Sequence, residues 1–420
     1  MTARSLTLGL VALLFISATA DAGRKKRRAK ERRAQERARA ERLVLATSEI
    51  DEASLLDIGI QTFDLGVADV PIEDGSKDLW RANPEIRRSE AVFMAHQLKR
   101  TLASSGFWGA VRVVPLGTQG LDLILSGEIV RSTPKDLVLA VELVDATGQV
   151  WHRGRYRNEL GKHAYPERVE GVPRHEPHQV VYDRIANALS AELSRHPRSE
   201  RLRIREVAEL RFAAELAPDL FGNYLQVDRR GGWAPVRLPA EGDPMVDRMR
   251  RIRQRDHLVV DTLDEHYAGF ADAMDLPYWD WRAYSHEEFL AWKKIRRKAR
   301  TRKFFGGLLI AGGILGEAAG LEDAAVLGGA MVLQSGIGKG KEAKIHREAL
   351  GELATSFHSE VSPLRVEVEG RTLQLEGTAD QQYAQWRGLL QRIFEEESGL
   401  GQVEQEQQQE LLTRPSYPRR

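Results

Sequence analysis

The sequence predicts an α+β protein: an N-terminal α/β domain with a mixed sheet, a helical middle region, a glycine-rich helical hairpin and a small C-terminal α/β unit. Three observations support this prediction. Apolar and polar residues alternate along 121–130 and 137–144, which is the period of half-buried strands. Apolar residues recur every three or four positions along 86–102 and 202–214, which is the helical period. Residues 304–340 contain eleven glycines.

Residues 1–22 are expected to be a signal peptide that exports the chain across a bacterial-type inner membrane. Arg4 supplies a positive charge, Leu6 to Ile16 form an apolar run, and Ala18-Thr19-Ala20 fits a small-x-small cleavage site. The run is shorter than the roughly 20 apolar residues of a membrane-spanning helix, which favours a cleaved signal peptide. An uncleaved N-terminal anchor is the alternative. The mature chain is therefore expected in the periplasm or at the periplasmic face of the outer membrane.

Charge is unevenly distributed. Residues 24–42 hold eleven Lys or Arg and three Glu, whereas the chain outside this run and beyond residue 20 holds 50 basic and 58 acidic residues. The surrounding segment 23–54 is expected to be a basic arm of helix-forming residues without an apolar face. Such an arm could bind an anionic membrane surface, and a solvated charged linker is the alternative. Nucleic acid is not expected as a partner, because the chain is expected to be exported.

The chain contains no cysteine. This excludes disulfides, cysteine metal sites, a cysteine nucleophile and the lipid-modified N-terminal cysteine of bacterial lipoproteins.

Residues 55–197 predict a β-α-β unit followed by a three-stranded antiparallel meander. A helix is expected to start at Asn83-Pro84, with Asn as the cap and Pro in the first turn, and to end at Gly106. A turn is expected at 145–148, and a helix at 179–193 is expected to cover the sheet. The strands are expected at 57–63, 111–115, 121–130, 137–144 and 149–156.

Four phrases carry a resemblance: IGIQTFD, RRSEAVFMAHQLKRTLASSGFW, LDLILSGEIVRS and LVLAVELVDATGQVWHRGRY. Together they resemble the small α/β domain of envelope assembly proteins, including the N-terminal domain of TolB and lipoproteins of the CsgG/LpoB type. The resemblance covers about 140 residues and includes no catalytic residues. It implies that the domain binds an envelope protein partner.

Residues 198–303 predict a charged helical region with a loop at 219–244. Ser285 and Glu288 form a capping box, which predicts a helix start. Three tryptophans nearby could stack on a glycan ring or lie at a membrane interface, while packing against neighbouring helices is the favoured interpretation. These possible ligand-stacking residues are Trp279, Trp281 and Trp292.

Residues 304–340 are expected to form a helical hairpin that resembles the glycine-zipper segments of outer-membrane proteins. Each of its two apolar runs is too short to span a bilayer as a helix, and the charged turn lies at 321–323. A stripe of glycine lets helices approach closely, so the hairpin is expected to associate with a membrane or to form a homo-oligomer. A buried soluble hairpin is the alternative. The expected packing positions are Gly312, Gly316, Gly320, Gly328 and Gly329.

Residues 341–400 predict a small unit with strands at 365–369 and 372–376 and a helix at 382–396. The phrase RVEVEGRTLQLEGTADQQ is similar to BON-type domains, which implies association with membranes and envelope partners. The Gln/Glu-rich and Pro/Arg-rich tail, 401–420, is expected to be disordered.

No catalytic residue, cofactor or metal site is predicted, because the metalloprotease HExxH and hydrolase GxSxG motifs are missing. His257, Asp261 and Glu265 recur at helical spacing and could form one wall of a metal site, but a solvated charged face is the preferred interpretation. The sequence thus favours a non-enzymatic envelope protein that binds a protein partner. An envelope glycan-binding protein or hydrolase, and a soluble periplasmic scaffold, are the alternatives.

Overall fold

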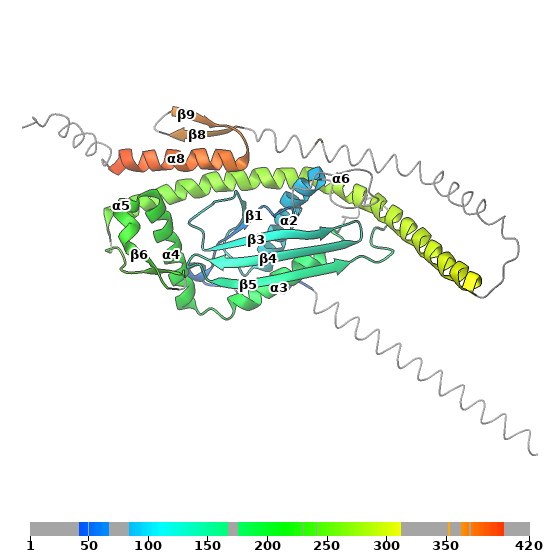
Figure 1. Ribbon diagram of the computed structural model, residues 1–420. Helices are drawn as coiled ribbons and strands as arrows, with labels where there is room; N and C mark the ends of the chain where they lie inside the picture. The colour runs from blue at the N-terminus through cyan, green and yellow to red at the C-terminus, as the bar shows by residue number, and fades with distance from the viewer. Residues whose placement is uncertain are drawn as a thin grey trace, which may run out of the picture. The chain divides into compact units, whose positions relative to one another are not determined.

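The structure is a computed structural model of the chain, and it confirms the α+β class (Figure 1). The described residues between Leu45 and Ser398 form one compact unit. The predicted signal peptide, most of the basic arm, the hairpin beyond Ala311 and the tail lie outside the described residues. Of the arm, the described part contains one short 3-10 helix, η1 (Glu52–Ser54). The structure describes residues 42–48, 50–66, 84–166, 175–229, 231–240, 242–311, 352, 363–368 and 371–398.

A five-stranded mixed sheet has the order β2-β1-β3-β4-β5. The first strand is parallel to both of its neighbours, while β3, β4 and β5 form an antiparallel meander. A parallel pair needs a long crossover, which the helix after β1 supplies. The predicted β-α-β unit and meander are therefore confirmed. The strands are β1 (Ile58–Gln61), β2 (Val111–Val114), β3 (Leu123–Ser132), β4 (Asp136–Asp145) and β5 (Val150–Glu159).

Two helices cover one face of this sheet, α2 (Pro84–Ser105) and α3 (Gln179–Leu193). Both occupy the ranges that the sequence predicts. The core between helices and sheet contains fully buried aliphatic side chains, which contribute roughly 1.5–3 kcal/mol each relative to exposure. Examples are Ile58, Ile60, Leu98, Leu102, Leu125, Leu139, Ile185 and Leu189.

The segment predicted as a loop at 219–244 contains short regular elements, so that prediction is partly wrong. After α4 (Arg198–Leu216) come α5 (Pro218–Phe221), η2 (Gly222–Tyr224) and the hairpin of β6 (Leu225–Val227) and β7 (Trp233–Pro235). The Trp233 N–H of this hairpin donates to the Thr147 carbonyl at 2.6 Å, a contact between distant parts of the chain that local composition does not reveal.

One helix, α6 (Pro244–Ala311), replaces the separate helices that the sequence predicts. The helix start predicted at Ser285 is wrong, since α6 passes through Pro277 and Ser285 without interruption. An interior proline costs about 3 kcal/mol, and the buried side chains in the next turns, among them Tyr278 and Arg282, offset that cost. The boundary predicted between 303 and 304 also falls inside α6.

The C-terminal unit matches its prediction closely. A hairpin of β8 (Leu364–Val368) and β9 (Arg371–Leu375) precedes α8 (Ala379–Ser398), which packs on α6 and α4. Four apolar side chains at helical spacing along α8 are buried. These are Tyr383, Trp386, Leu390 and Ile393.

Candidate functional site

A buried ion cluster joins α2 to α6 and to the turn before α3. We define it by Arg87, Glu90, Glu176, Tyr278 and Arg282. Glu90 Oε1 accepts a hydrogen bond from the Tyr278 hydroxyl at 2.7 Å, and its other oxygen lies 3.4 Å from Arg87 Nη1. Arg282 Nη1 donates to Glu176 Oε1 at 3.3 Å. The cluster therefore connects residues that are up to 188 positions apart.

Burial controls the electrostatics of the cluster. Arg282 is 1% exposed and Glu90 is 2% exposed. Burial raises the pKa of Glu176, while the positive charge of Arg282 and the backbone N–H of His178 act in the opposite direction. Burial also lowers the pKa of His178 well below its usual value, with Arg282 adding to the effect. Two carboxylates face two guanidinium groups, so breaking one pair would leave an uncompensated buried charge.

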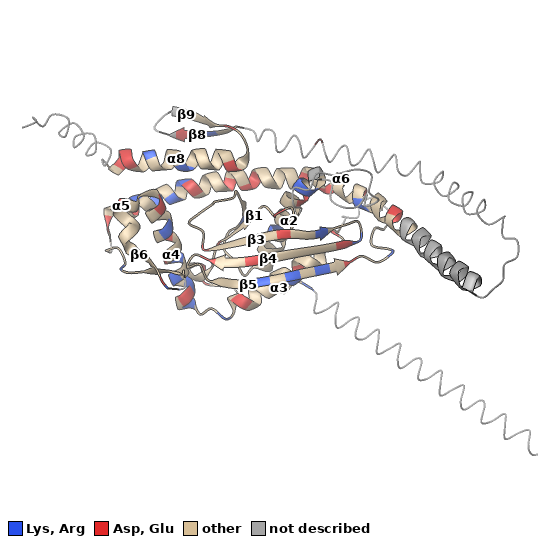
Figure 2. Cartoon of the chain, viewed as in Figure 1, with Lys and Arg blue, Asp and Glu red and all other residues tan. Residues whose placement is uncertain are grey.

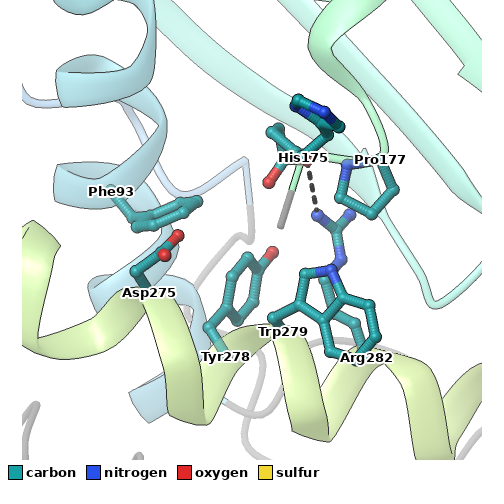
Figure 3. A pocket seen from close by; sticks show the side chains of 8 residues that line it. Phe93, His175, Pro177, Asp275, Tyr278, Trp279 and Arg282 are labelled. Carbon is teal, nitrogen blue, oxygen red and sulfur yellow. Dashed lines mark hydrogen bonds and ion pairs between the residues drawn. The ribbon is translucent and has the colours of Figure 1, made fainter. Parts of the chain in front are cut away.

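A very small cavity, of about 10 Å³, lies beside this cluster (Figure 3). Figure 3 shows Trp279 and Arg282 on α6 facing the 175–177 turn. Two nitrogens of Arg282, Nε and Nη2, are buried without a hydrogen-bond partner among the described residues. The lining residues are Phe93, His175, Glu176, Pro177, Asp275, Tyr278, Trp279 and Arg282.

The predicted ligand-stacking tryptophans have different surroundings. The Trp281 ring stacks on Tyr278, with centroids 5.8 Å apart and planes at 19°. Trp279 lies edge-on to Tyr165 at 5.3 Å. Both rings are half-buried. Trp292 belongs to α6, but its side chain lies outside the described residues. The structure thus brings two of the three rings to the ion cluster.

The helical row of His257, Asp261 and Glu265 forms no metal site in the described structure. Asp261 pairs with Arg112 of β2. Burial lowers the pKa of His257 to about 4, and the charges of Arg253 and Arg112 add to this shift. Glu265 is exposed. Within the row, Asp261 therefore pairs with an arginine of the sheet, whereas Glu265 lies on the exposed face of α6.

A second buried carboxylate, Asp256 of α6, connects the C-terminal helix to the rest of the unit. Its oxygens accept hydrogen bonds from Trp386 Nε1 at 3.1 Å and from the Tyr383 hydroxyl at 3.4 Å. Arg387 Nη1 lies 4.0 Å away. Burial raises the pKa of Asp256 to about 6.

The two edges of the main sheet differ. At β2, Asp264 of α6 accepts a hydrogen bond from the Val113 backbone N–H at 2.8 Å, and Asp380 accepts one from the Leu116 N–H at 2.8 Å. Side chains thus satisfy backbone groups along this edge. At β5, no strand of the described structure pairs with the outer edge.

The β5 edge carries a row of basic side chains, which we call the arginine row: Arg153, Arg155 and Arg157. They alternate along the strand and therefore lie on one face of the sheet. Figure 2 shows these basic segments along β5. The Arg153 side chain is 71% exposed and that of Arg157 is 57% exposed. Each of these two contacts an acidic side chain of β4, Glu142 or Asp136.

Arg155 is exposed between them, and the described residues supply no ion-pair partner for it. Sequence reasoning missed this row, although the phrase HRGRYR inside a predicted strand could have revealed it. It also missed Glu90, Glu176 and Arg282, because no local pattern marks residues that meet only after folding.

The predicted helix-packing glycines, Gly312 through Gly329, lie outside the described residues. Within the part of the chain that the structure describes, every helix is too short or too polar to cross a membrane. Comparison of the chain with protein-family models, with curated proteins and with solved structures returned no match.

Proposed function

We propose that this chain is a non-enzymatic protein of the bacterial cell envelope. In this proposal the α/β unit binds a protein partner, and the glycine-rich segment associates with a membrane or forms a homo-oligomer. The observation that carries the proposal is the contrast between the two sheet edges: α6 covers β2, whereas no strand of the described residues pairs with the outer edge of β5. Open edges invite pairing, and proteins usually block them unless they are used.

The contacts of the buried ion cluster support a structural role for its carboxylates rather than a catalytic one. Its carboxylates hydrogen-bond to Tyr278 and Arg282, so they hold α6 against α2 and the 175–178 turn. A glycan-binding or hydrolytic role would need free ring faces at the tryptophans, and Tyr278 covers one face of Trp281. The resemblance of residues 55–197 to envelope assembly domains agrees with a binding role.

Fractionation of a bacterium that produces the full chain tests the envelope assignment. We expect the mature protein outside the inner membrane, accessible to protease in spheroplasts but not in intact cells. We expect a high-salt wash to release only part of it and detergent to release the rest, because salt screens the basic arm and not apolar contacts. A protein that stays in the cytosol would contradict the envelope assignment, and one that is wholly soluble without salt or detergent would exclude membrane association and leave the homo-oligomer.

A triple change of Gly312, Gly316 and Gly320 to Leu tests the glycine stripe. We expect a smaller fraction of the protein to need detergent for its release, or a smaller oligomer, because bulky side chains prevent close approach of two helices. Gly222→Ala is the matched control, because a Cβ there meets no atom within 4 Å. Chemical crosslinking in intact cells then identifies the protein partner.

A further inference from the structure

We propose that the outer edge of β5 binds an extended, acidic segment of the partner protein, which adds a sixth strand to the main sheet. This inference rests on the proposed function, because it names the surface and the chemistry by which the partner is bound. It rests on three features of β5: its open backbone edge, the exposed arginine row, and the blocked edge on the opposite side of the sheet.

The backbone of β5 has hydrogen-bonding groups that point away from β4. The Arg157 carbonyl accepts a hydrogen bond from the Arg184 side chain at 2.8 Å, which shows that it points away from β4. In an antiparallel pair every second residue has the same orientation, so the backbone groups of Arg155 and Arg153 also point outward. The strand is ten residues long, which is ample for pairing with another strand.

The arginine row determines what kind of strand fits. Alternate residues of a strand lie roughly 7 Å apart, and an added strand has the same spacing. Acidic side chains at every second position of the added strand would therefore each face one arginine. Opposite charges across neighbouring strands are favourable. Arg155 is the central member and has no ion-pair partner among the described residues, so it is available for a new pair.

A second copy of this chain is a poor occupant of the same edge. Pairing β5 with β5 of another copy in antiparallel fashion would place the two arginine rows opposite each other on one face. Like charges directly opposite destabilise a strand pair. A lipid or nucleic acid surface would use the positive charge but would leave the outward backbone N–H and C=O groups without partners. An acidic polypeptide satisfies both sets of groups.

The first test uses the full chain and an acetylated peptide of about eight residues in which Glu alternates with Val and Thr. We expect the peptide to bind with an affinity that falls as salt increases. We expect amide hydrogen exchange to slow at Arg153 and Arg155, whose N–H groups face outward. Exchange at His152 and Gly154, which already pair with β4, should change little.

Two further peptides separate strand addition from simple charge attraction. A peptide with N-methyl groups on the amides that face β5 keeps its charge but cannot pair, and we expect it to bind at least about tenfold more weakly. A peptide with Lys in place of Glu should not bind measurably. Equal binding of the methylated and unmethylated peptides, or unchanged exchange at Arg153 and Arg155, would overturn strand addition.

Protein variants give a second and independent test. Arg155→Ala removes the charge and keeps the backbone N–H. Arg155→Pro removes both, and it leaves the hydrogen bonds between β5 and β4 intact because the lost N–H faces outward. We expect peptide binding to weaken in the order wild type, Arg155→Ala, Arg155→Pro. Arg203→Glu, a change at an exposed arginine of α4, is the matched control and should bind like the wild type. Circular dichroism confirms that each variant is folded.

The same variants distinguish failure of this inference from failure of the proposed function. If the partner is still crosslinked to Arg155→Pro in intact cells, the chain binds a partner by another surface and the strand-addition inference is wrong. If the wild type forms no crosslink at all, the binding function itself is wrong. If Arg155→Pro instead abolishes self-association of the chain, the occupant is a second copy and the acidic partner is excluded.

Discussion

Asp264 of α6 and Val113 of β2 are joined by a hydrogen bond of 2.8 Å from the Val113 backbone N–H to the Asp264 carboxylate. The same carboxylate pairs with Lys99 of α2. One side chain therefore satisfies an edge group of the sheet and holds α6 against α2. This arrangement satisfies one outward N–H of β2, and it makes Asp264 a point where stability can be tested.

We expect Asp264→Ala to lower the free energy of unfolding by about 2–4 kcal/mol, because the Val113 N–H and the Lys99 ammonium lose their common partner. Urea denaturation measures this change. Asp264→Asn keeps an acceptor oxygen for Val113 and should cost less. Glu265→Ala, next to it on the exposed face of α6, should change stability by no more than about 0.5 kcal/mol. An equal effect of both alanine changes would contradict the edge-blocking role.

Asp256 is expected to make the attachment of α8 depend on pH. Its folded pKa is raised to about 6 from 3.8, so the folded state holds the proton more tightly than the unfolded state. The stabilisation from this group is therefore complete below pH 3.8 and is lost as the pH rises through about 6. We expect the wild type to lose about 3 kcal/mol relative to Asp256→Asn over that range. Unfolding curves of both proteins at several pH values measure the difference.

At neutral pH the two substitutions of Asp256 should differ. Asp256→Asn retains an oxygen that can accept from Trp386 Nε1, whereas Asp256→Ala leaves the buried donors of Trp386 and Tyr383 unpaired. Each unpaired donor costs about 1–3 kcal/mol. Limited proteolysis near α8 should therefore be faster in Asp256→Ala than in Asp256→Asn. Identical rates would show that these hydrogen bonds do not hold α8.

Arg282→Ala should lower the free energy of unfolding by about 3–5 kcal/mol, because Glu176 is left as a buried charge without its partner. Combining it with Glu176→Gln removes that charge, and the double variant should recover part of the loss. Arg195→Ala is the matched control, since the Arg195 side chain is 70% exposed and its pair with Glu192 contributes little. A double variant no more stable than Arg282→Ala would show that the two charges are not coupled.

Any side chain at Gly127 of β3 is expected to lower the stability of the fold. A Cβ at this position would lie 2.6 Å from the Phe63 ring, which is itself 3% exposed. Gly127→Ala should cost about 1–3 kcal/mol through overpacking. The cost should be smaller in a Phe63→Leu background, where the ring is removed. Gly161→Ala, where a Cβ meets no atom within 4 Å, should be nearly neutral. Thermal unfolding of the wild type, both single variants and the double variant measures the coupling, with Gly161→Ala as the control.

Several parts of the fold could be predicted from the sequence because their signals are local. The helix at 179–193 has apolar residues at helical spacing, and the turn at 145–148 contains Gly148 with a φ of +87°. The helix that begins at Pro84 and the C-terminal pair of strands were also found. In each case the period of the pattern and the cap or turn residue lie within one element, so no distant contact is needed to recognise them.

The candidate site could not be predicted in the same way. The arginine row is visible in the sequence as HRGRYR. It can contact an added strand only if β5 lies at the edge of the sheet, and the pairing of all five strands decides which strand lies there. Glu90 and Tyr278 are separated by 188 positions and meet only through the packing of α2 on α6.

The sequence by itself determined where the strands and most helices lie, together with the expectation of export and the chemistry excluded by the lack of cysteine. Tertiary structure decided which strand lies at the edge, which charges are paired, and whether a helix continues through Pro277. The physical reason is that burial energy depends on neighbours from distant parts of the chain. The turns of α6 after Pro277 remain helical because Tyr278 and Arg282 are buried there.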